Sequence, residues 1–188
     1  RAIGILVTLF CTLLTVASAH ADDFGLLDQH GNFHQISRYS NDNLVMIMPV
    51  SMDEPDSLTN AHAMQSLAEE MSEQGIIGLF LESDAAALED PETRSQTITN
   101  WAAEEGLTLP VLIDSSQTAA ATLEVKSLGE VIGMDPSGLS AYFRGQWDEA
   151  SVRTAISDIL AGRPVRPTFA EPSGPALTYH YQERFAES

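Results

Sequence analysis

The spacing of apolar residues first predicts a β-α-β unit near the middle of the chain. Residues 44–50 (LVMIMPV) and 76–81 are almost continuously apolar, which is typical of strands buried on both faces of a sheet. Between them, apolar side chains recur at steps of three and four, at Ala61, Met64, Leu67, Ala68 and Met71. This spacing predicts a helix over 57–74, with Ser57 as its N-cap and Gly75 at its end.

Helices and strands continue to alternate after this unit. Asp90-Pro91-Glu92 predicts the start of a second helix, because proline and acids are favoured in a first turn, and Gly106 ends it. A strand at 109–113 and a short helix at 116–123 follow. A last helix is predicted between Asp148, its cap, and Gly162.

Two hairpins complete the pattern. Turn-forming residues separate 24–27 from 33–36 and, as Asp-Pro-Ser-Gly, separate 131–134 from 140–144. The element order is therefore hairpin, β-α-β-α-β-α, hairpin, α. It predicts an α/β fold with a central mixed sheet flanked by helices, an N-terminal hairpin, and a C-terminal β-hairpin and helix.

Residues 1–21 are expected to be a targeting segment. Arg1 precedes an apolar run over 2–16, and Ala19-His20-Ala21 fits a signal peptidase site, so export to a periplasm or the cell exterior is expected. An uncleaved membrane anchor is the alternative. The single cysteine, Cys11, lies in this segment. A cleaved chain would therefore have no disulfide, thiolate metal site or cysteine nucleophile.

The folded domain is expected to span 22–162 and to be followed by an extended tail, 163–188. This tail has four prolines and no sustained periodicity, so we expect it to be disordered alone or wrapped on a partner. Its spaced aromatic residues are Tyr179, Tyr181 and Phe185. They make the tail the predicted contact with another exported or membrane protein.

The charge of the chain limits its partners. It has 27 acids, nine bases and a net charge of −18, and its one lysine is Lys126. Nucleic acids and anionic lipid surfaces bind clustered Lys and Arg, so neither is an expected partner. Contact with a membrane is expected only if residues 1–21 stay uncleaved.

Three segments resemble one known family. DFGLLDQHGNFHQISRYSNDNLVMIMPV, GLTLPVLIDSS and GMDPSGLSAYFRG are similar, in this order, to segments of redoxin domains. These domains form the alkyl hydroperoxide reductase/thiol-specific antioxidant branch of the thioredoxin superfamily, and the resemblance spans about 23–162. It implies a thioredoxin-like fold and, in working members, a reactive cysteine at the start of the first long helix.

The segment VSMDEPDSL lies where this family would carry its cysteine. When it is laid on the family pattern G-x-C-P-x-x-R, Glu54 takes the cysteine position and Leu58 the arginine position. Thioredoxins have a cis-proline before their fourth strand, and this chain has Gly129, followed by Glu130, at that position. No catalytic residue can therefore be assigned, and the resemblance marks a degenerate site at Asp53, Glu54, Pro55, Asp56 and Ser57.

The acids of this segment have two interpretations. They can be stabilisers of the first turn of the long helix, because its dipole favours negative charge there. Alternatively, Asp53, Glu54 and Asp56 line a pocket with Glu130 that binds a cation or a basic peptide. No metal ligand set and no cofactor is assigned.

The sequence thus predicts an exported redoxin-fold protein that has lost thiol chemistry and acts as a protein-binding or scaffold module. Two alternatives stay open. One is an antioxidant oxidoreductase or peroxidase by descent, and the other is a metal-binding protein that uses the acidic patch.

Overall fold

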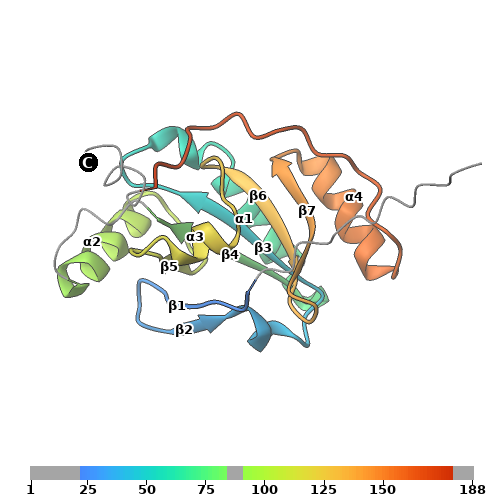
Figure 1. The fold of residues 1–188 in the computed structure, drawn as a ribbon, viewed down its shortest axis with the longest axis horizontal. Coiled ribbons are helices and arrows are strands. Elements are labelled where there is room, and N and C mark those ends of the chain that lie inside the picture. Colours follow the sequence, from blue (N-terminus) through green and yellow to red (C-terminus); the bar gives the residue numbers. More distant parts are fainter. Residues whose placement is uncertain (1–21, 84–90, 180–188) are drawn as a thin grey trace, which may run out of the picture.

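The computed structural model describes residues 22–83 and 91–179. Their helices and strands follow the predicted order (Figure 1). The strands are β1 (Gly25–Leu27), β2 (Phe33–Gln35), β3 (Leu44–Val50), β4 (Ile76–Glu82), β5 (Val111–Ile113), β6 (Glu130–Asp135) and β7 (Ser140–Gln146). The helices are α1 (Ala61–Glu70), α2 (Pro91–Glu104), α3 (Thr118–Thr122) and α4 (Glu149–Leu160), and the short 3-10 helices are η1 (Ile36–Tyr39), η2 (Pro55–Leu58) and η3 (Ser72–Gln74).

A five-stranded mixed sheet forms the centre of the domain, in the order β5-β4-β3-β6-β7. β3 and β5 pair with β4 in parallel, whereas β6 is antiparallel to both β3 and β7. β1 and β2 form a separate antiparallel hairpin. The predicted α/β architecture and both hairpins are therefore confirmed.

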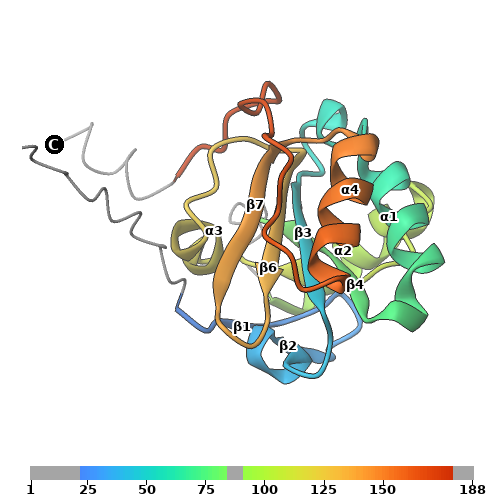
Figure 2. The same cartoon turned by 90° about the vertical axis from the view of Figure 1, so that its right-hand side faces the viewer.

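An apolar core lies against each face of this sheet, with α1, α2 and α4 on one side of the sheet and α3 on the other (Figure 2). Alternate residues of β3 point to opposite faces: Met46 and Met48 belong to the core under α1, α2 and α4, whereas Val45 and Ile47 belong to the core under α3 and the β1–β2 hairpin. All four side chains are fully buried. This explains why β3 appears in the sequence as one continuous apolar run.

The first long helix begins later than predicted. The stretch predicted as a helix over 57–74 is divided into the end of η2, the ten-residue helix α1 and the short η3. Asn60, not Ser57, precedes α1, and its side chain makes no capping hydrogen bond. The prediction failed because the Ser57 hydroxyl bonds back to the Ser51 main chain instead of capping α1. Gly75 ends η3 at a φ of +70°, as a left-handed terminating residue.

The tail is extended but packs on its own domain as far as Tyr179 (Figures 1 and 2). The Phe169 ring stacks on Phe143 of β7, with ring centroids 4.8 Å apart. The Gln146 amide donates to the Ala170 carbonyl at 2.8 Å, and Leu177 is buried. The expectation that the tail is disordered alone is therefore wrong for residues 163–179. Main-chain contacts with the edge of the sheet and side-chain contacts hold the tail in place. Because the tail forms neither a helix nor a long strand, its sequence has no periodic pattern of apolar residues.

A buried carboxylate anchors the start of the tail on α4. The Asp158 side chain is fully buried and lies 2.8 Å from the guanidinium of Arg166 and 3.1 Å from that of Arg163. Hydrogen bonds from the Arg166 side chain, together with those from Arg163 and the Arg166 amide, lower the pKa of Asp158 to about 2, although desolvation opposes this shift.

This anchor should make stability depend on pH in acid. A carboxylate whose pKa is lowered by folding stabilises the folded state fully above its unfolded value of about 4, and loses that effect as the pH falls through its folded value. Thermal unfolding should give Asp158→Asn a lower Tm than the wild type at about pH 6, with a gap that narrows below about pH 4 and closes near pH 2. A gap that stays constant over this range would contradict the assignment.

Within residues 22–83 and 91–179, no helix is both long and apolar enough to cross a membrane. The predicted signal segment, 1–21, lies outside this part of the chain.

Candidate functional site

The loop after β3 carries the residues predicted to replace a redox site. β3 is the central strand of the sheet, and the residue after it, Ser51, is fully buried. The Ser51 amide donates to Ser57 Oγ at 3.0 Å, and the Ser57 hydroxyl donates to the Ser51 carbonyl at 3.4 Å. Ser57 therefore closes the loop from inside.

Four exposed residues form the tip of this loop: Asp53, Glu54, Pro55 and Asp56. Glu54 precedes η2, and its side chain caps no amide of that helix. The first turn of α1 contains no acid. The interpretation of Glu54 as a stabiliser of the first long helix is therefore wrong, because a separate single turn lies between Glu54 and α1.

Glu54 and Ser57 have the spacing of the two thiols in a Cys-x-x-Cys motif. The Ser57 amide donates to the Glu54 carbonyl at 2.9 Å, so the two residues close one turn. Glu54 is exposed, whereas Ser57 is only 1% exposed. The pair therefore consists of one solvent-exposed side chain, Glu54, and one buried side chain, Ser57, and neither contains sulfur.

Gly129 lies directly against Ser57. A Cβ atom at Gly129 would be 3.2 Å from the Ser57 carbonyl oxygen. The Gly129 amide donates to the Pro49 carbonyl at 2.7 Å, and its φ is +75°. A proline could neither donate this hydrogen bond nor adopt this φ. The backbone at the position that the resemblance assigns to the cis-proline therefore favours glycine and excludes proline.

Glu130 does not join the acids of the loop tip. Its side chain is buried, with Oε1 accepting the Lys126 amide at 2.8 Å and Oε2 lying 3.2 Å from the Arg144 guanidinium. Arg144 also donates to the carbonyls of Leu123 and Glu124, each at 3.0 Å. Glu130 therefore holds the segment before β6 in place, and it does not line a pocket with Asp53, Glu54 and Asp56.

A cavity of about 240 Å³ lies between the loop, Gly129 and the tail. Asp56 is the acid of the loop tip that lines it, and the tail contributes one wall. The lining residues are Asp56, Thr59, Asn60, Leu128, Gly129, Gln146, Ser173, Gly174 and Pro175. The tail therefore covers part of the site that the resemblance marks.

Two further predictions concern a metal site and the aromatic residues of the tail. In the two described ranges, no three His, Cys, Asp or Glu side chains come close enough to hold a metal ion. The Tyr179 hydroxyl donates to the carbonyls of Ala120 and Val125 at 3.0 and 2.8 Å, so this half-buried ring is engaged by its own domain. Tyr181 and Phe185 lie outside the described residues.

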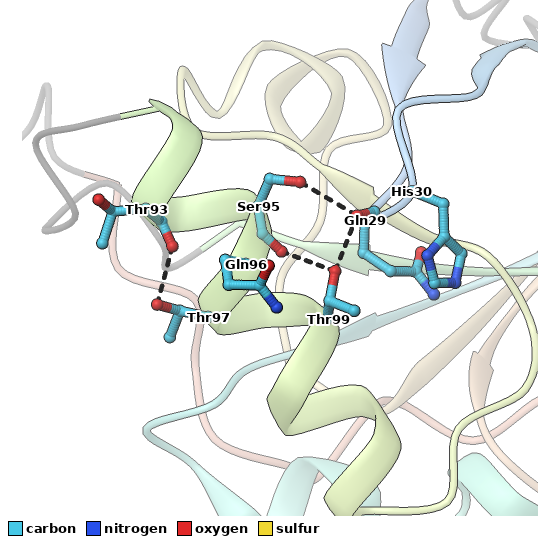
Figure 3. Close-up of a pocket in the computed structure, with 7 residues that line it drawn as sticks. All are labelled: Gln29, His30, Thr93, Ser95, Gln96, Thr97 and Thr99. Carbon is cyan, nitrogen blue, oxygen red and sulfur yellow. Dashed lines mark hydrogen bonds between the residues drawn. The ribbon is translucent and has the colours of Figure 1, made fainter.

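A wider open cavity, of about 670 Å³, lies between α2 and the turn of the β1–β2 hairpin (Figure 3). Hydroxyl groups line it, but those of Ser95 and Thr99 donate to the Gln29 carbonyl at 3.0 and 2.8 Å. These contacts attach α2 to the hairpin. The cavity therefore lies between two elements that these hydrogen bonds join.

Comparisons with known proteins identify the family of this chain and its fold. The sequence profile described as the AhpC/TSA family matches residues 17–139. The chain belongs to the AhpC/TSA family. No curated protein matches it in sequence. The single cysteine, Cys11, precedes the domain, so this family member lacks an active-site cysteine.

Solved structures show that the fold of this AhpC/TSA-family chain is thioredoxin-like. An uncharacterized conserved protein from Geobacillus kaustophilus is 23% identical, with a TM-score of 0.74 over 86% of this chain and 90% of that one. A hypothetical protein from Sinorhizobium meliloti is 22% identical, with a TM-score of 0.72 over 85% and 92%. The peroxidoxin BcpB from Mycobacterium tuberculosis is 20% identical, with a TM-score of 0.57 over 80% and 97%.

Sequence reasoning missed two features of the site. The buried Ser51–Ser57 contact leaves no periodic signal, although Ser57 at three residues after Glu54 could have suggested the second thiol position. The tail segment over Gly129 was also missed, because the pairing is between main-chain atoms far apart in the sequence.

Proposed function

We propose that this chain is an exported AhpC/TSA-family protein that has lost thiol chemistry and works as a protein-binding module. The observation that carries the proposal is the pair Glu54 and Ser57 in the turn opposite Gly129. It has the spacing and the difference in exposure of a dithiol pair, without the sulfur atoms.

The chemistry of the site supports this proposal. Peroxide reduction and disulfide exchange by this family need a thiolate as the attacking group. A carboxylate at Glu54 is a far weaker nucleophile toward sulfur or peroxide oxygen, and the Ser57 hydroxyl is already shared with the Ser51 main chain. Cys11 is the one sulfhydryl of the chain, and it belongs to the predicted signal segment.

The surface supports a binding role. Asp56, one of the exposed acids at the loop tip, lines a cavity whose far wall is the tail. The net charge of −18 favours a partner other than a nucleic acid or an anionic membrane. The partner in this proposal is another exported or membrane protein, contacted through the tail, including Tyr181 and Phe185.

Redox assays on the full chain and on Cys11→Ser test the proposal. Both proteins should consume no hydrogen peroxide with dithiothreitol and should not reduce insulin above the rate of the reductant alone. The Cys11→Ser chain contains no thiol, so peroxide consumption or insulin reduction by this variant would contradict the proposal. Activity in the wild type that Cys11→Ser lacks would assign a redox role to Cys11 and would equally contradict it.

A further inference from the structure

We propose that Lys126, Ser127 and Leu128, here called the receptor segment, bind an extended peptide by strand addition, and that the chain's own tail occupies this place in the structure. The peptide has a glycine followed by a proline and, two residues later, an apolar side chain. This inference rests on the proposed binding function and names the partner chemistry of the same site.

The tail shows how a peptide binds there. The Leu128 amide donates to the Pro175 carbonyl at 2.8 Å, and the Leu177 amide donates to the Lys126 carbonyl at 3.2 Å. Ser127 and Ala176 form an antiparallel bridge between these two bonds. Pairing through the main chain is the way in which extended peptides add to an exposed strand edge.

The receptor segment is held by contacts that do not involve the tail. The buried Glu130 carboxylate accepts the Lys126 amide at 2.8 Å, and Arg144 ties that carboxylate to the carbonyls of Leu123 and Glu124. The segment should therefore keep its shape when the tail leaves. A preformed edge of this kind lowers the entropy cost of binding a strand.

The tail also defines the sequence that the receptor segment accepts. A Cβ atom at Gly174 would lie 2.1 Å from the Leu128 carbonyl oxygen, a main-chain atom that cannot move aside. At Pro175 the carbonyl is the bonded group, so proline loses nothing there. The Leu177 side chain is buried in the core under α3. The chemistry selected is thus Gly-Pro-x-apolar.

The place of the tail strand connects this edge to the vacated site. Gly129 follows the receptor segment directly and touches Ser57. Gly174 and Pro175 line the cavity of about 240 Å³ that also contains Asp56. A peptide that replaced the tail strand would therefore lie beside the exposed acids of the loop tip. Because the tail is tethered, its effective concentration reaches the millimolar range, and a free peptide binds measurably only once the tail is released.

The test uses the full chain with Gly174→Ala, which should release the tail strand by the clash with Leu128. Hydrogen exchange at the Leu128 amide should be at least about tenfold faster than in the wild type. A fluorescent peptide copying residues 170–179 should bind this variant at least about tenfold more tightly than the wild type, and should restore protection at Leu128. The same peptide with alanine at the glycine should bind neither protein.

Two further variants complete the design. Glu171→Ala, an exposed change in the same tail, should behave as the wild type. Leu177→Ser releases the tail by removing its apolar anchor and should bind the peptide as Gly174→Ala does, which keeps the test valid if one variant folds poorly.

Unchanged exchange at Leu128 in both releasing variants would overturn the proposal, and so would faster exchange without peptide binding. A concentration-dependent dimer of the wild type that Gly174→Ala abolishes would assign the edge to the tail of a second copy and would overturn the choice of a separate peptide. None of these outcomes depends on redox activity, so failure here leaves the redox test of the proposed function unaffected.

Discussion

Replacing Gly129 with proline should lower the free energy of unfolding by about 3 kcal/mol. The Gly129 amide donates to the Pro49 carbonyl at 2.7 Å, and the φ of Gly129 is +75°. Proline has no amide hydrogen and fixes φ near −65°, so it loses the hydrogen bond and cannot adopt the native backbone. The lost bond accounts for about 1 kcal/mol and the forced backbone change for the rest.

Urea unfolding of Gly129→Pro and Gly129→Ala measures this effect. Alanine keeps the amide, so it should cost only about 1 kcal/mol, from the positive φ and from the contact of its Cβ with the Ser57 carbonyl. The expected result is that the free energy of unfolding is highest with glycine at position 129, lower with alanine and lowest with proline. A proline variant as stable as the wild type would mean that this position can still take the family's cis-proline backbone.

Such a result bears on the backbone that this site can adopt. Ser57 connects the two positions that the resemblance assigns to the thiol and the cis-proline, because its amide bonds to the Glu54 carbonyl and its own carbonyl lies against Gly129. Restoring one residue does not restore the other, because Gly129 is fixed by its bond to Pro49 as well as by its contact with Ser57. A thiol at position 54 alone would therefore leave the backbone at Gly129 unchanged.

The sheet was predictable because its signal is local. β3 and β4 are each a run of apolar residues, and the turns that contain Gly31 and Gly138 lie between short strands. Alternating burial on two faces follows from the strand period alone. The fold class needs only this order of elements, together with the rule that parallel strands are joined by helices.

The start of α1 and the path of the tail could not be predicted in the same way. Ser57 has the composition of an N-cap, but its hydroxyl is held by Ser51, a partner that only the folded loop supplies. The tail is ordered by an ion-pair group at Asp158 and by pairing with Lys126 and Leu128. Contacts of this kind depend on residues far apart in the chain and leave no periodic pattern.

The candidate site was located by resemblance, but its grouping of acids was not correct. Glu130 follows Gly129 in the sequence, which suggested a shared pocket with Glu54. In the structure its side chain turns to Arg144 on the neighbouring strand β7. Gly129 precedes β6 and the Glu130 carboxylate is held by the Lys126 amide and Arg144, so nearness in sequence to Gly129 did not place this carboxylate near the loop tip.

The claim that Glu54 and Ser57 occupy the positions of a dithiol pair can be tested by restoring the sulfur atoms. In the Cys11→Ser background, Glu54→Cys with Ser57→Cys gives a chain whose only thiols are at these two positions. The Ser57 amide bonds to the Glu54 carbonyl, and residues that close such a turn have Cα atoms within about 7 Å. A disulfide needs a Cα separation of about 4.4–6.8 Å.

Disulfide formation is a better measure here than thiol reactivity. Asp53 and Asp56 flank the new cysteine at position 54, and nearby carboxylates raise the pKa of a thiol. The restored pair is therefore expected to react slowly but to pair fully under a mild oxidant. The control is Asp56→Cys with Ser57→Cys in the same background, because neighbouring Cα atoms are only about 3.8 Å apart.

The decisive measurement is the intact mass and thiol content of the two variants after mild oxidation with oxidised glutathione. We expect the Glu54→Cys, Ser57→Cys chain to lose two hydrogen atoms and to show no free thiol until it is reduced, while the adjacent-cysteine control forms no intramolecular disulfide. Two free or glutathionylated thiols in the Glu54→Cys, Ser57→Cys chain would contradict the assignment of this turn as a vacated thiol site.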